Sequence, residues 1–490
     1  MRERSAILDF FPFTPTPSQA RVIDKLDHFL RHGEEDSLFL LRGYAGTGKS
    51  SLVGAWTRML VSMGVPVRLL APTGRAAKVL GAYCGMPAYT IHRTIYRQRI
   101  GAGGAFTYDL GYNAGQQGTV FVVDEASMIS NQSEGNDSFG SGRLLDDLMD
   151  FCHSVPYSRI VLIGDDAQLP PVGTPQSPAL SPDYLRGYCS HLYEETLTDI
   201  VRQESAGEIV LTSYDLRQRI ADLQQGQPWA EPLLATPRRG GEVRIISGYD
   251  LPELMEESYR RAGQEETVLI TRSNREAEAY NQGIRHQTLG YEEEEEVVPG
   301  ERLMVVRNNY FYQPVDGEGK QTGGFIANGE ILEVRDARRT AELYGFTFRD
   351  AELVDGEGGF ISAKILLESL YSGTAALTGE QRQLLFDNVA LDYPGVQSRR
   401  QLYAEMRKNP YLNALQIKYA YAMTCNKAQG GQWREVFVSF GYLTPEMIDL
   451  SFLRWFYTAV TRATERLYLI DPPAFIFGQT EEEAIQLRDL

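Results

Sequence analysis

The stretch SLFLLRGYAGTGKSSLVGAW, residues 37–56, joins an apolar run to a helical pattern through a glycine-rich bend. The run Leu38–Leu41 is short and continuously apolar, which is typical of a parallel strand covered on both faces. After the bend, apolar residues recur at helical spacing from Leu52 until Gly64 and Pro66 end the pattern. Strand, bend and helix in this order predict a backbone loop that opens onto a helix N-terminus.

The bend itself matches G-x-x-x-x-G-K-[ST], the pattern of a phosphate-binding loop. Its glycines let successive backbone N–H groups converge on phosphate oxygens, while Lys49 adds a positive charge and Ser50 a hydroxyl group for Mg²⁺. An ordinary glycine-rich turn is the alternative, but the flanking strand and helix favour nucleotide binding. The predicted nucleotide-binding residues of this loop are Gly43, Gly46, Thr47, Gly48, Lys49, Ser50 and Ser51.

Two later apolar strands also end in polar residues. TVFVVDEASMI ends its apolar run at Asp124 and Glu125, and in RIVLIGDDAQLPPVG the apolar run is followed by Asp165, Asp166 and Gln168. Asp124 is predicted to hold Mg²⁺, Glu125 to orient or deprotonate the attacking water, and Gln168 to contact the γ-phosphate. The alternative is a solvated acidic strand end. Together with PVRLLAPT, these strands predict an α/β fold with a parallel, doubly wound sheet and its site along one edge.

Composition and charge narrow the class of protein. A length of 490 residues favours about three domains, and the net charge is −17. From Ser37 through Tyr108, however, there are nine basic residues and no Asp or Glu, which predicts one face that handles phosphates. No signal-peptide pattern or run of about 20 apolar residues occurs, so we expect a soluble, cytoplasmic protein. The four cysteines have no metal-binding spacing, and we expect them to be reduced.

Segments in the second half make the sequence resemble the helicases of superfamily one. After the segments above come LTDIVRQ with Arg202, VLITRSNREAEAYNQGIR, YAMTCNKAQGGQW, and FYTAVTRATERLYLI with Arg462. The RecD and Dda-like subgroup (subgroup B) fits best, because TIHRTIY lies close before the strand that ends at Asp124, and GGFIANGEILEV resembles the SH3-like insert of that subgroup. The resemblance runs from Pro15 to about Asp471.

The resemblance implies two RecA-like motor domains that share one ATP with Mg²⁺. It assigns the γ-phosphate to Arg202 and Arg462, reached from the second domain, and the adenine edge to Gln19; Gly430 is also assigned to the nucleotide. For either arginine the alternative is a surface salt bridge, and for Gln19 it is the first turn of a helix.

The resemblance also implies contacts with single-stranded DNA, mostly with its phosphates, which suits sequence-independent binding. These contacts are assigned to Pro72, Thr73, Arg75, His92, Arg93, Thr424, Asn426, Lys427 and Gln429. A structural role is the alternative for His92. Most relatives carry His at the position of Asn426, and often Ser and Glu at those of Ala428 and Gln432, so this chain departs from the family pattern in the loop that the resemblance assigns to coupling DNA contact with ATP.

The expected organisation has three parts. Residues 1–190 form the first motor domain with a small pin hairpin at about 97–118, residues 191–297 and 413–490 form the second, and residues 298–412 form an SH3-like β insert with a helical extension. The extension is expected to reach the pin, although a packed surface helix pair would fit its sequence equally well.

The predicted function is an ATP-dependent DNA helicase that moves 5′ to 3′ on single-stranded DNA and unwinds a duplex with a 5′ tail. One alternative is a DNA-stimulated ATPase that acts as a remodeller or switch without separating strands. A second is a non-catalytic DNA-binding module, against which the intact set of Lys49, Asp124, Glu125, Gln168 and Arg462 argues. We expect a monomer, and the sequence identifies neither protein partners nor a role in replication, repair or recombination.

Overall fold

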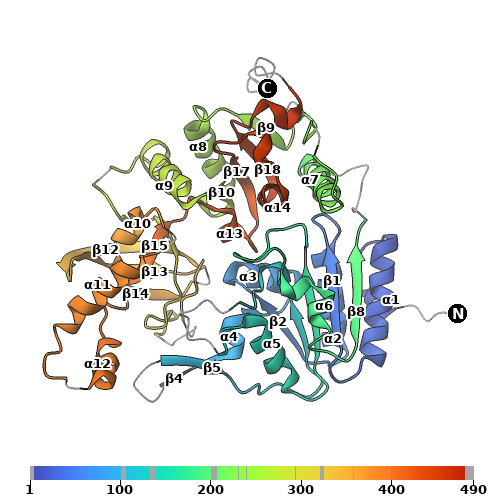
Figure 1. The fold of residues 1–490 in the computed structure, drawn as a ribbon, viewed down its shortest axis with the longest axis horizontal. Coiled ribbons are helices and arrows are strands. Elements are labelled where there is room, and N and C mark those ends of the chain that lie inside the picture. The colour runs from blue at the N-terminus through green and yellow to red at the C-terminus, as the bar shows by residue number, and fades with distance from the viewer. Residues whose placement is uncertain are drawn as a thin grey trace.

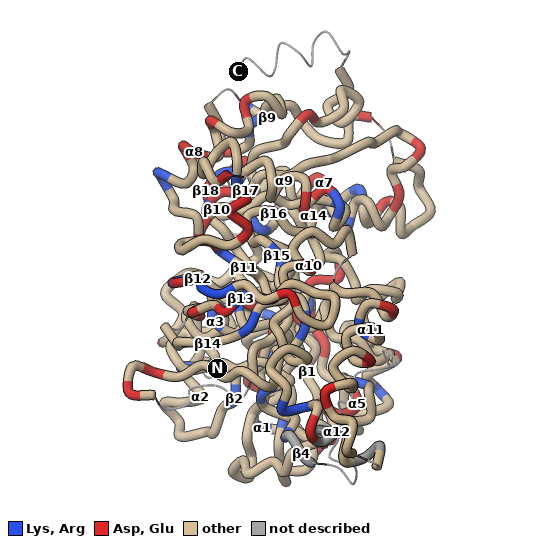
Figure 2. The backbone as a smooth tube through the Cα atoms, turned by 90° about the vertical axis from the view of Figure 1, so that its left-hand side faces the viewer, with Lys and Arg blue, Asp and Glu red and all other residues tan. Residues whose placement is uncertain are grey.

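The computed structural model of the chain describes residues 5–479, apart from 101–105, 133–139, 200–206, 230, 239, 293, 320–324, 357, 375 and 397. Two α/β domains and a β-barrel make up the molecule (Figure 1). Seen from the side of the barrel, the second α/β domain lies above, and the barrel with its helices lies in front of the first α/β domain (Figure 2).

The first α/β domain is built on a six-stranded parallel sheet with the strand order β3-β2-β6-β7-β1-β8. Its strands are β1 (Leu38–Gly43), β2 (Val67–Ala71), β3 (Ala88–Thr90), β6 (Val120–Val123), β7 (Arg159–Gly164) and β8 (Leu192–Leu197). Its helices are α1 (Pro17–His32), α2 (Lys49–Ser62), α3 (Gly74–Cys84), α4 (Ile91–Ile95), α5 (Leu144–His153) and α6 (Pro182–Leu185).

Strand β1 shows why this sheet is covered on both faces. Leu38 and Leu40 belong to one apolar cluster, and Phe39 and Leu41 belong to another. Because side chains alternate along a strand, the two clusters lie on opposite faces of the sheet. This confirms the buried parallel strand predicted before the glycine-rich bend.

The predicted end of the first domain at residue 190 needs a correction. Strand β8 (Leu192–Leu197) pairs in parallel with β1 along its whole length and forms the edge of the first sheet. The first domain therefore extends through Leu197.

The second α/β domain has a five-stranded parallel sheet with the order β16-β10-β17-β18-β9. Its strands are β9 (Val243–Ile246), β10 (Thr267–Thr271), β16 (Ala422–Thr424), β17 (Trp433–Ser439) and β18 (Ala463–Ile470). Its helices are α7 (Glu208–Gln224), α8 (Leu251–Ala262), α9 (Asn274–Gly283), α13 (Cys425–Ala428) and α14 (Leu450–Val460).

A closed β-barrel interrupts the second domain between α9 and β16. Its strands are β11 (Arg302–Val305), β12 (Ile331–Leu343), β13 (Phe346–Val354), β14 (Phe360–Leu366) and β15 (Leu415–Tyr419), and the helices between β14 and β15 are α10 (Glu368–Tyr371), α11 (Gly379–Ala390) and α12 (Arg399–Met406). The predicted small β insert is thus confirmed. Its predicted end at residue 412 is too early, because β15 closes the barrel by pairing with both β11 and β14.

A two-stranded hairpin, β4 (Tyr96–Ile100) and β5 (Phe106–Leu110), leaves the first domain toward the barrel (Figure 1). It corresponds to the predicted pin, whose residues 101–105 lie outside the described part of the chain. Among the described residues, no helix combines the length and apolar character that crossing a membrane requires.

Candidate active site

The glycine-rich bend lies between β1 and α2, as the sequence predicts, and its glycines have a structural reason. Gly46 and Gly48 have φ angles of +76° and +78°, which residues with a Cβ atom rarely adopt. A Cβ atom at Gly43 would come within 3.0 Å of both Lys49 Cγ and Leu197 Cβ. The backbone can therefore wrap closely around Lys49 only because these residues are glycine.

Lys49 is held by acceptors that a phosphate group can replace. Its Nζ donates hydrogen bonds to the carbonyl oxygens of Gly43 and Tyr44, the latter at 3.0 Å, and lies 3.8 Å from Oδ2 of Asp165. Phosphate oxygens offer the same amine stronger, charged acceptors. The loop therefore suits a nucleoside triphosphate, with Ser50 and Ser51 in the first turn of α2.

Asp124 and Glu125 follow β6 and lie at the carboxyl edge of the sheet. The backbone N–H of Glu125 donates to Oδ1 of Asp124 at 2.8 Å, and Glu125 has a φ angle of +52°. Burial and the neighbouring charge of Glu125 raise the pKa of Asp124 to about 6. Mg²⁺ is usually bound by one or two protein ligands together with substrate phosphates and water. The carboxylate of Asp124 and the hydroxyl of Ser50 are ligands of this type. In the described part of the chain, no group of three or more His, Cys, Asp or Glu could hold a metal.

Arg462 reaches this edge from the second α/β domain. The side chain is almost fully buried, and its guanidinium lies 3.9 Å from Oε1 of Glu125. Nε donates to the carbonyl oxygen of Thr458 and Nη1 to that of Gly431, both at 3.0 Å, so the orientation is fixed from within its own domain. The structure therefore brings Lys49, Asp124, Glu125 and Arg462 together. Arg202, the other predicted arginine, lies outside the described residues.

Helix α14 makes further contacts with the first domain that the sequence reasoning missed. The hydroxyl of Tyr457 donates to Oδ2 of Asp165 at 2.7 Å and accepts from the N–H of Ala45 at 2.9 Å. Oγ1 of Thr458 accepts from the N–H of Leu169 at 2.9 Å. A signal was present, because Tyr457 and Thr458 lie in the last turn of the helix that leads directly to Arg462. A tyrosine in an apolar helix, however, is usually part of the core.

We call the surface where the two α/β domains meet the domain seam. It comprises α14 and residues 429–433 of the second domain, and the phosphate loop, residues 165–169 and α3 of the first. Gln168 lies in it with 7% of its surface exposed, and its Oε1 has no hydrogen-bond partner among the described residues. A buried acceptor without a partner is costly, so this atom suits a water molecule beside a bound nucleotide.

Gln19 is buried at the start of α1, where it contributes to a capping box with Thr16. Its Oε1 accepts from the N–H of Thr16 at 3.0 Å, and its Nε2 donates to the carbonyl oxygen of Thr47 at 2.9 Å. The structure thus links α1 to the phosphate loop through Gln19, and the contact with adenine stays a prediction.

Three residues predicted to bind DNA or nucleotide lie in the domain seam. The guanidinium of Arg75 stacks 4.0 Å above the ring of Trp433 and donates to the carbonyl oxygen of Gln432. Gln429 donates from Nε2 to the carbonyl oxygen of Leu169 at 2.7 Å. Gly430 packs so closely on α3 that a Cβ would lie 2.9 Å from the Cβ of Ala76 and 3.0 Å from Oγ1 of Thr73. The side chains of Arg75 and Gln429 and the backbone of Gly430 thus join the domains in this structure.

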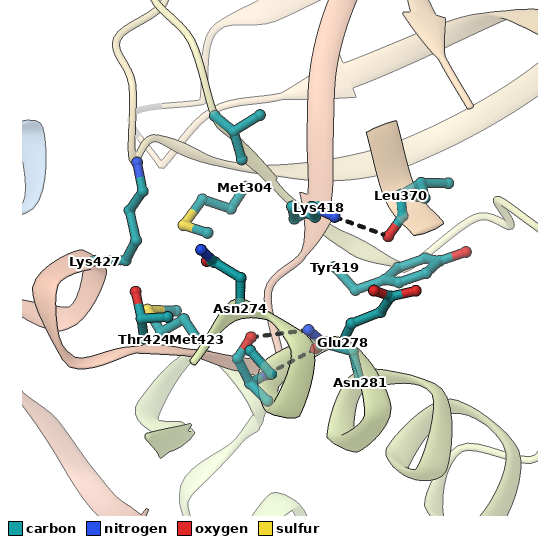
Figure 3. A pocket seen from close by; sticks show the side chains of 13 residues that line it. Asn274, Glu278, Asn281, Met304, Leu370, Lys418, Tyr419, Met423, Thr424 and Lys427 are labelled. Atoms are coloured by element: carbon teal, nitrogen blue, oxygen red, sulfur yellow. Dashed lines mark hydrogen bonds between the residues drawn. The ribbon is translucent and has the colours of Figure 1, made fainter. Parts of the chain in front are cut away.

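The other predicted DNA contacts from the second domain lie toward the barrel. Asn426 is exposed, and Nζ of Lys427 donates to Oδ1 of Asn328, in the turn before β12, at 2.5 Å. Thr424 and Lys427 line one side of a pocket that Asn274 of α9 and Met304 of β11 line from the others (Figure 3). Burial lowers the pKa of Lys427 to about 8.

Two of the other predicted DNA contacts of the first domain lie at the base of the hairpin. His92 and Arg93 belong to α4, directly before β4; the ring of His92 lies 5.7 Å from that of Tyr96, and the guanidinium of Arg93 lies 5.3 Å from the ring of Tyr89. Pro72 and Thr73 follow β2, and Thr73 caps α3 by accepting from the N–H of Ala76.

The hairpin meets the barrel through aromatic rings. Tyr108 of β5 lies 4.0 Å from Tyr310, between ring centroids, and Tyr310 lies 4.8 Å from Phe325. Both Tyr310 and Phe325 belong to the segment between β11 and β12. The segment between β11 and β12 thus supplies these ring contacts with the hairpin. From the sequence, the helical extension of the insert is expected to reach the pin, and this contact stays a prediction.

Comparison with known families agrees with this arrangement. Residues 16–225 match the family model described as an AAA domain, and residues 419–470 match that of the UvrD-like helicase C-terminal domain. The first match contains the phosphate loop, and the second contains Arg462. These two matches support the resemblance of the chain to the helicases of superfamily one.

The individual relatives are distant in sequence. Over 154 residues, 31% of this chain, the sequence is 33% identical to the ATP-dependent RecD2 DNA helicase of Deinococcus radiodurans, but the alignment spans only 18% of that protein. An uncharacterized protein of Acanthamoeba polyphaga mimivirus is 21% identical, over 92% of this chain and 98% of its own. The crystal structure of Pif1 helicase from Bacteroides in complex with ADP-AlF3 and ssDNA is 14% identical over 97% of both chains, with a TM-score of 0.45.

Proposed function

We propose that this protein is an ATP-dependent DNA helicase of superfamily one that moves 5′ to 3′ on single-stranded DNA and unwinds duplex DNA. The observation that carries the proposal is the approach of Arg462, from the second α/β domain, to within 3.9 Å of Glu125 at the edge of the first sheet. A site completed by both domains makes hydrolysis depend on how the domains meet, which is the requirement for a motor.

Each residue of the site has a role in the proposed hydrolysis of ATP. The phosphate loop and Lys49 bind the β- and γ-phosphates, and Glu125 orients the attacking water and accepts its proton. Arg462 stabilises the charge that develops as the γ-phosphate leaves, and Arg202 is proposed as a second arginine with this role. Mg²⁺, held by Ser50 and Asp124, would neutralise phosphate charge.

The proposed DNA path crosses both α/β domains on the side of the barrel. Thr424, Asn426 and Lys427 would contact phosphates on the second domain. Pro72, Thr73, His92 and Arg93 would do so on the first, and the hairpin β4–β5 would separate the strands where it meets the barrel. The name of the Deinococcus radiodurans relative, an ATP-dependent DNA helicase, supports this proposal.

An unwinding assay on three labelled duplexes tests the function. The substrates carry a 5′ single-stranded tail, a 3′ tail or blunt ends, and each is incubated with Mg²⁺ and either ATP or no nucleotide. We expect strand separation only with ATP and only on the 5′-tailed duplex. Unwinding of the 3′-tailed duplex alone would contradict the direction, while DNA-stimulated hydrolysis without unwinding of any substrate would favour the remodeller.

A further inference from the structure

The buried carboxylate of Asp165 connects the phosphate-binding lysine with the second α/β domain. Only 1% of its surface is exposed. Oδ1 accepts from the N–H of Ala167 at 3.0 Å, while Oδ2 accepts from the hydroxyl of Tyr457 at 2.7 Å and lies 3.8 Å from Nζ of Lys49. Lys49 and Tyr457 therefore share one oxygen of one buried charge.

Tyr457 joins this carboxylate to the phosphate loop. It is buried to 1% exposure, and its hydroxyl accepts from the N–H of Ala45 while it donates to Asp165. Both partners belong to the first α/β domain, whereas Tyr457 belongs to α14, which also carries Thr458 and leads directly into Arg462. One hydroxyl group thus spans the domain seam beside the residue that binds phosphate.

The sharing of Oδ2 implies a linkage between nucleotide binding and domain contact. When phosphate oxygens attract the amine of Lys49, Asp165 keeps Tyr457 as its donor at Oδ2. Separating α14 from the first domain withdraws Tyr457 from Asp165. If Lys49 is bound to phosphate at that moment, neither Tyr457 nor Lys49 remains at Oδ2, and a buried carboxylate that loses its partners is strongly destabilising. Domain separation therefore costs more free energy when phosphate is bound than when Lys49 lies beside Asp165. By reciprocity, contact through Tyr457 must also favour the arrangement in which Lys49 faces the phosphates.

We propose that Tyr457 is a positioning residue that couples occupation of the phosphate loop to the meeting of the two α/β domains, through the shared carboxylate of Asp165. This inference rests on the proposed ATP hydrolysis. Tyr457 would touch neither the phosphate nor the attacking water. Through Asp165 and Tyr457, binding of phosphate to Lys49 would affect the position of α14 and therefore that of Arg462.

The test compares the steady-state hydrolysis of ATP, with saturating single-stranded DNA, in four variants of the full chain. Tyr457→Phe removes the hydroxyl and leaves the ring. Tyr421→Phe is the matched control, because that tyrosine is equally buried in the same part of the chain and its hydroxyl has no hydrogen-bond partner among the described residues. Asp165→Asn removes the charge, and the fourth variant combines Tyr457→Phe with Asp165→Asn.

We expect Tyr457→Phe to lower kcat about tenfold while the KM for ATP changes less than about threefold, since a hydrogen bond to a buried charge is lost chiefly when both domains meet around ATP. Tyr421→Phe should match the wild type. In the Asp165→Asn background, Tyr457→Phe should have little further effect, which a role in packing alone would not produce. Thermal unfolding checks that each variant is folded.

Three results would overturn the inference: a kcat for Tyr457→Phe within twofold of the wild type, a rise in KM with kcat unchanged, or effects that multiply in the double variant. If Tyr457→Phe does not fold, Asp165→Asn alone decides, with the same tenfold fall expected and an unchanged kcat contradicting it. A wild-type protein without DNA-stimulated hydrolysis would instead refute the proposed function, so the two failures are distinguishable.

Discussion

The phosphate loop and the surface predicted to bind DNA differ in how completely their polar residues are already satisfied by the protein. Around the loop, buried side chains from both α/β domains converge, with Arg462 and Tyr457 approaching Glu125 and Asp165. On the predicted DNA side, Asn426 is exposed and Lys427 has a single neutral oxygen of Asn328 as its hydrogen-bond acceptor in the described structure. The nucleotide site is thus largely formed in advance, whereas on the DNA side Asn426 faces solvent and Lys427 is only partly satisfied by the protein.

Arg75 and Gln429 sharpen this difference. Both were predicted to bind DNA, yet both bond across the domain seam. These hydrogen bonds can form only where the two domains meet. The comparison therefore predicts large losses of activity from changes at the nucleotide site and small, charge-dependent losses from changes on the DNA side.

The largest loss of activity is expected from Glu125→Gln, at the nucleotide site. The amide cannot accept a proton from the attacking water, so hydrolysis of ATP should fall by about 10² to 10⁴-fold. Binding of ATP and of single-stranded DNA, measured by fluorescence anisotropy, should remain near that of the wild type. Glu465→Gln is the matched control, because Glu465 is paired with Arg434 on the surface. Unchanged hydrolysis in Glu125→Gln would remove Glu125 from the mechanism.

A smaller effect is expected at Lys427, whose pKa of about 8 lies within reach of ordinary buffers. A bound phosphate favours the charged amine, so affinity should weaken as the pH rises through 8 and Lys427 loses its proton. Between pH 7 and 9, at fixed ionic strength, we expect wild-type affinity for oligo-dT to fall by up to about fivefold. Lys427→Arg stays charged and should show a flatter profile. Identical profiles for the two proteins would exclude a phosphate contact by Lys427.

The parts of the fold with strong local patterns were predictable from the sequence. The strand Leu38–Leu41, the bend with Lys49 and the helix after it have a fixed order and special glycines, and the structure confirms them. Strands β8 and β15 were misplaced relative to the domain boundaries for a physical reason. Strand β8 (LYEETL) carries three consecutive polar residues, and β15 (LQIKY) alternates polar with apolar residues. Each is assigned to its sheet only by partners distant in sequence, which no local pattern reveals.

The site shows a similar limit. Residue type and spacing predicted Lys49, Asp124 and Glu125, because phosphate chemistry restricts what can occupy these positions. The resemblance to the helicases of superfamily one predicted Arg462. Spacing could not tell whether Arg75 faces DNA or Trp433, since a guanidinium suits both. Nor could spacing single out Tyr457, because the hydrogen-bond partners of its hydroxyl, Asp165 and Ala45, belong to the other domain and are distant in sequence.

The measurement that tests the central claim most directly is the affinity for ADP with aluminium fluoride, which resembles the phosphate in transfer. In the presence of single-stranded DNA, the wild type should bind this complex at least about 10²-fold more tightly than ADP alone. Arg462→Ala should lose most of that gain while it binds ADP as the wild type does, because the arginine acts on the transferring phosphate from the second domain. An Arg462→Ala protein that retains the full gain would contradict a site completed by both domains.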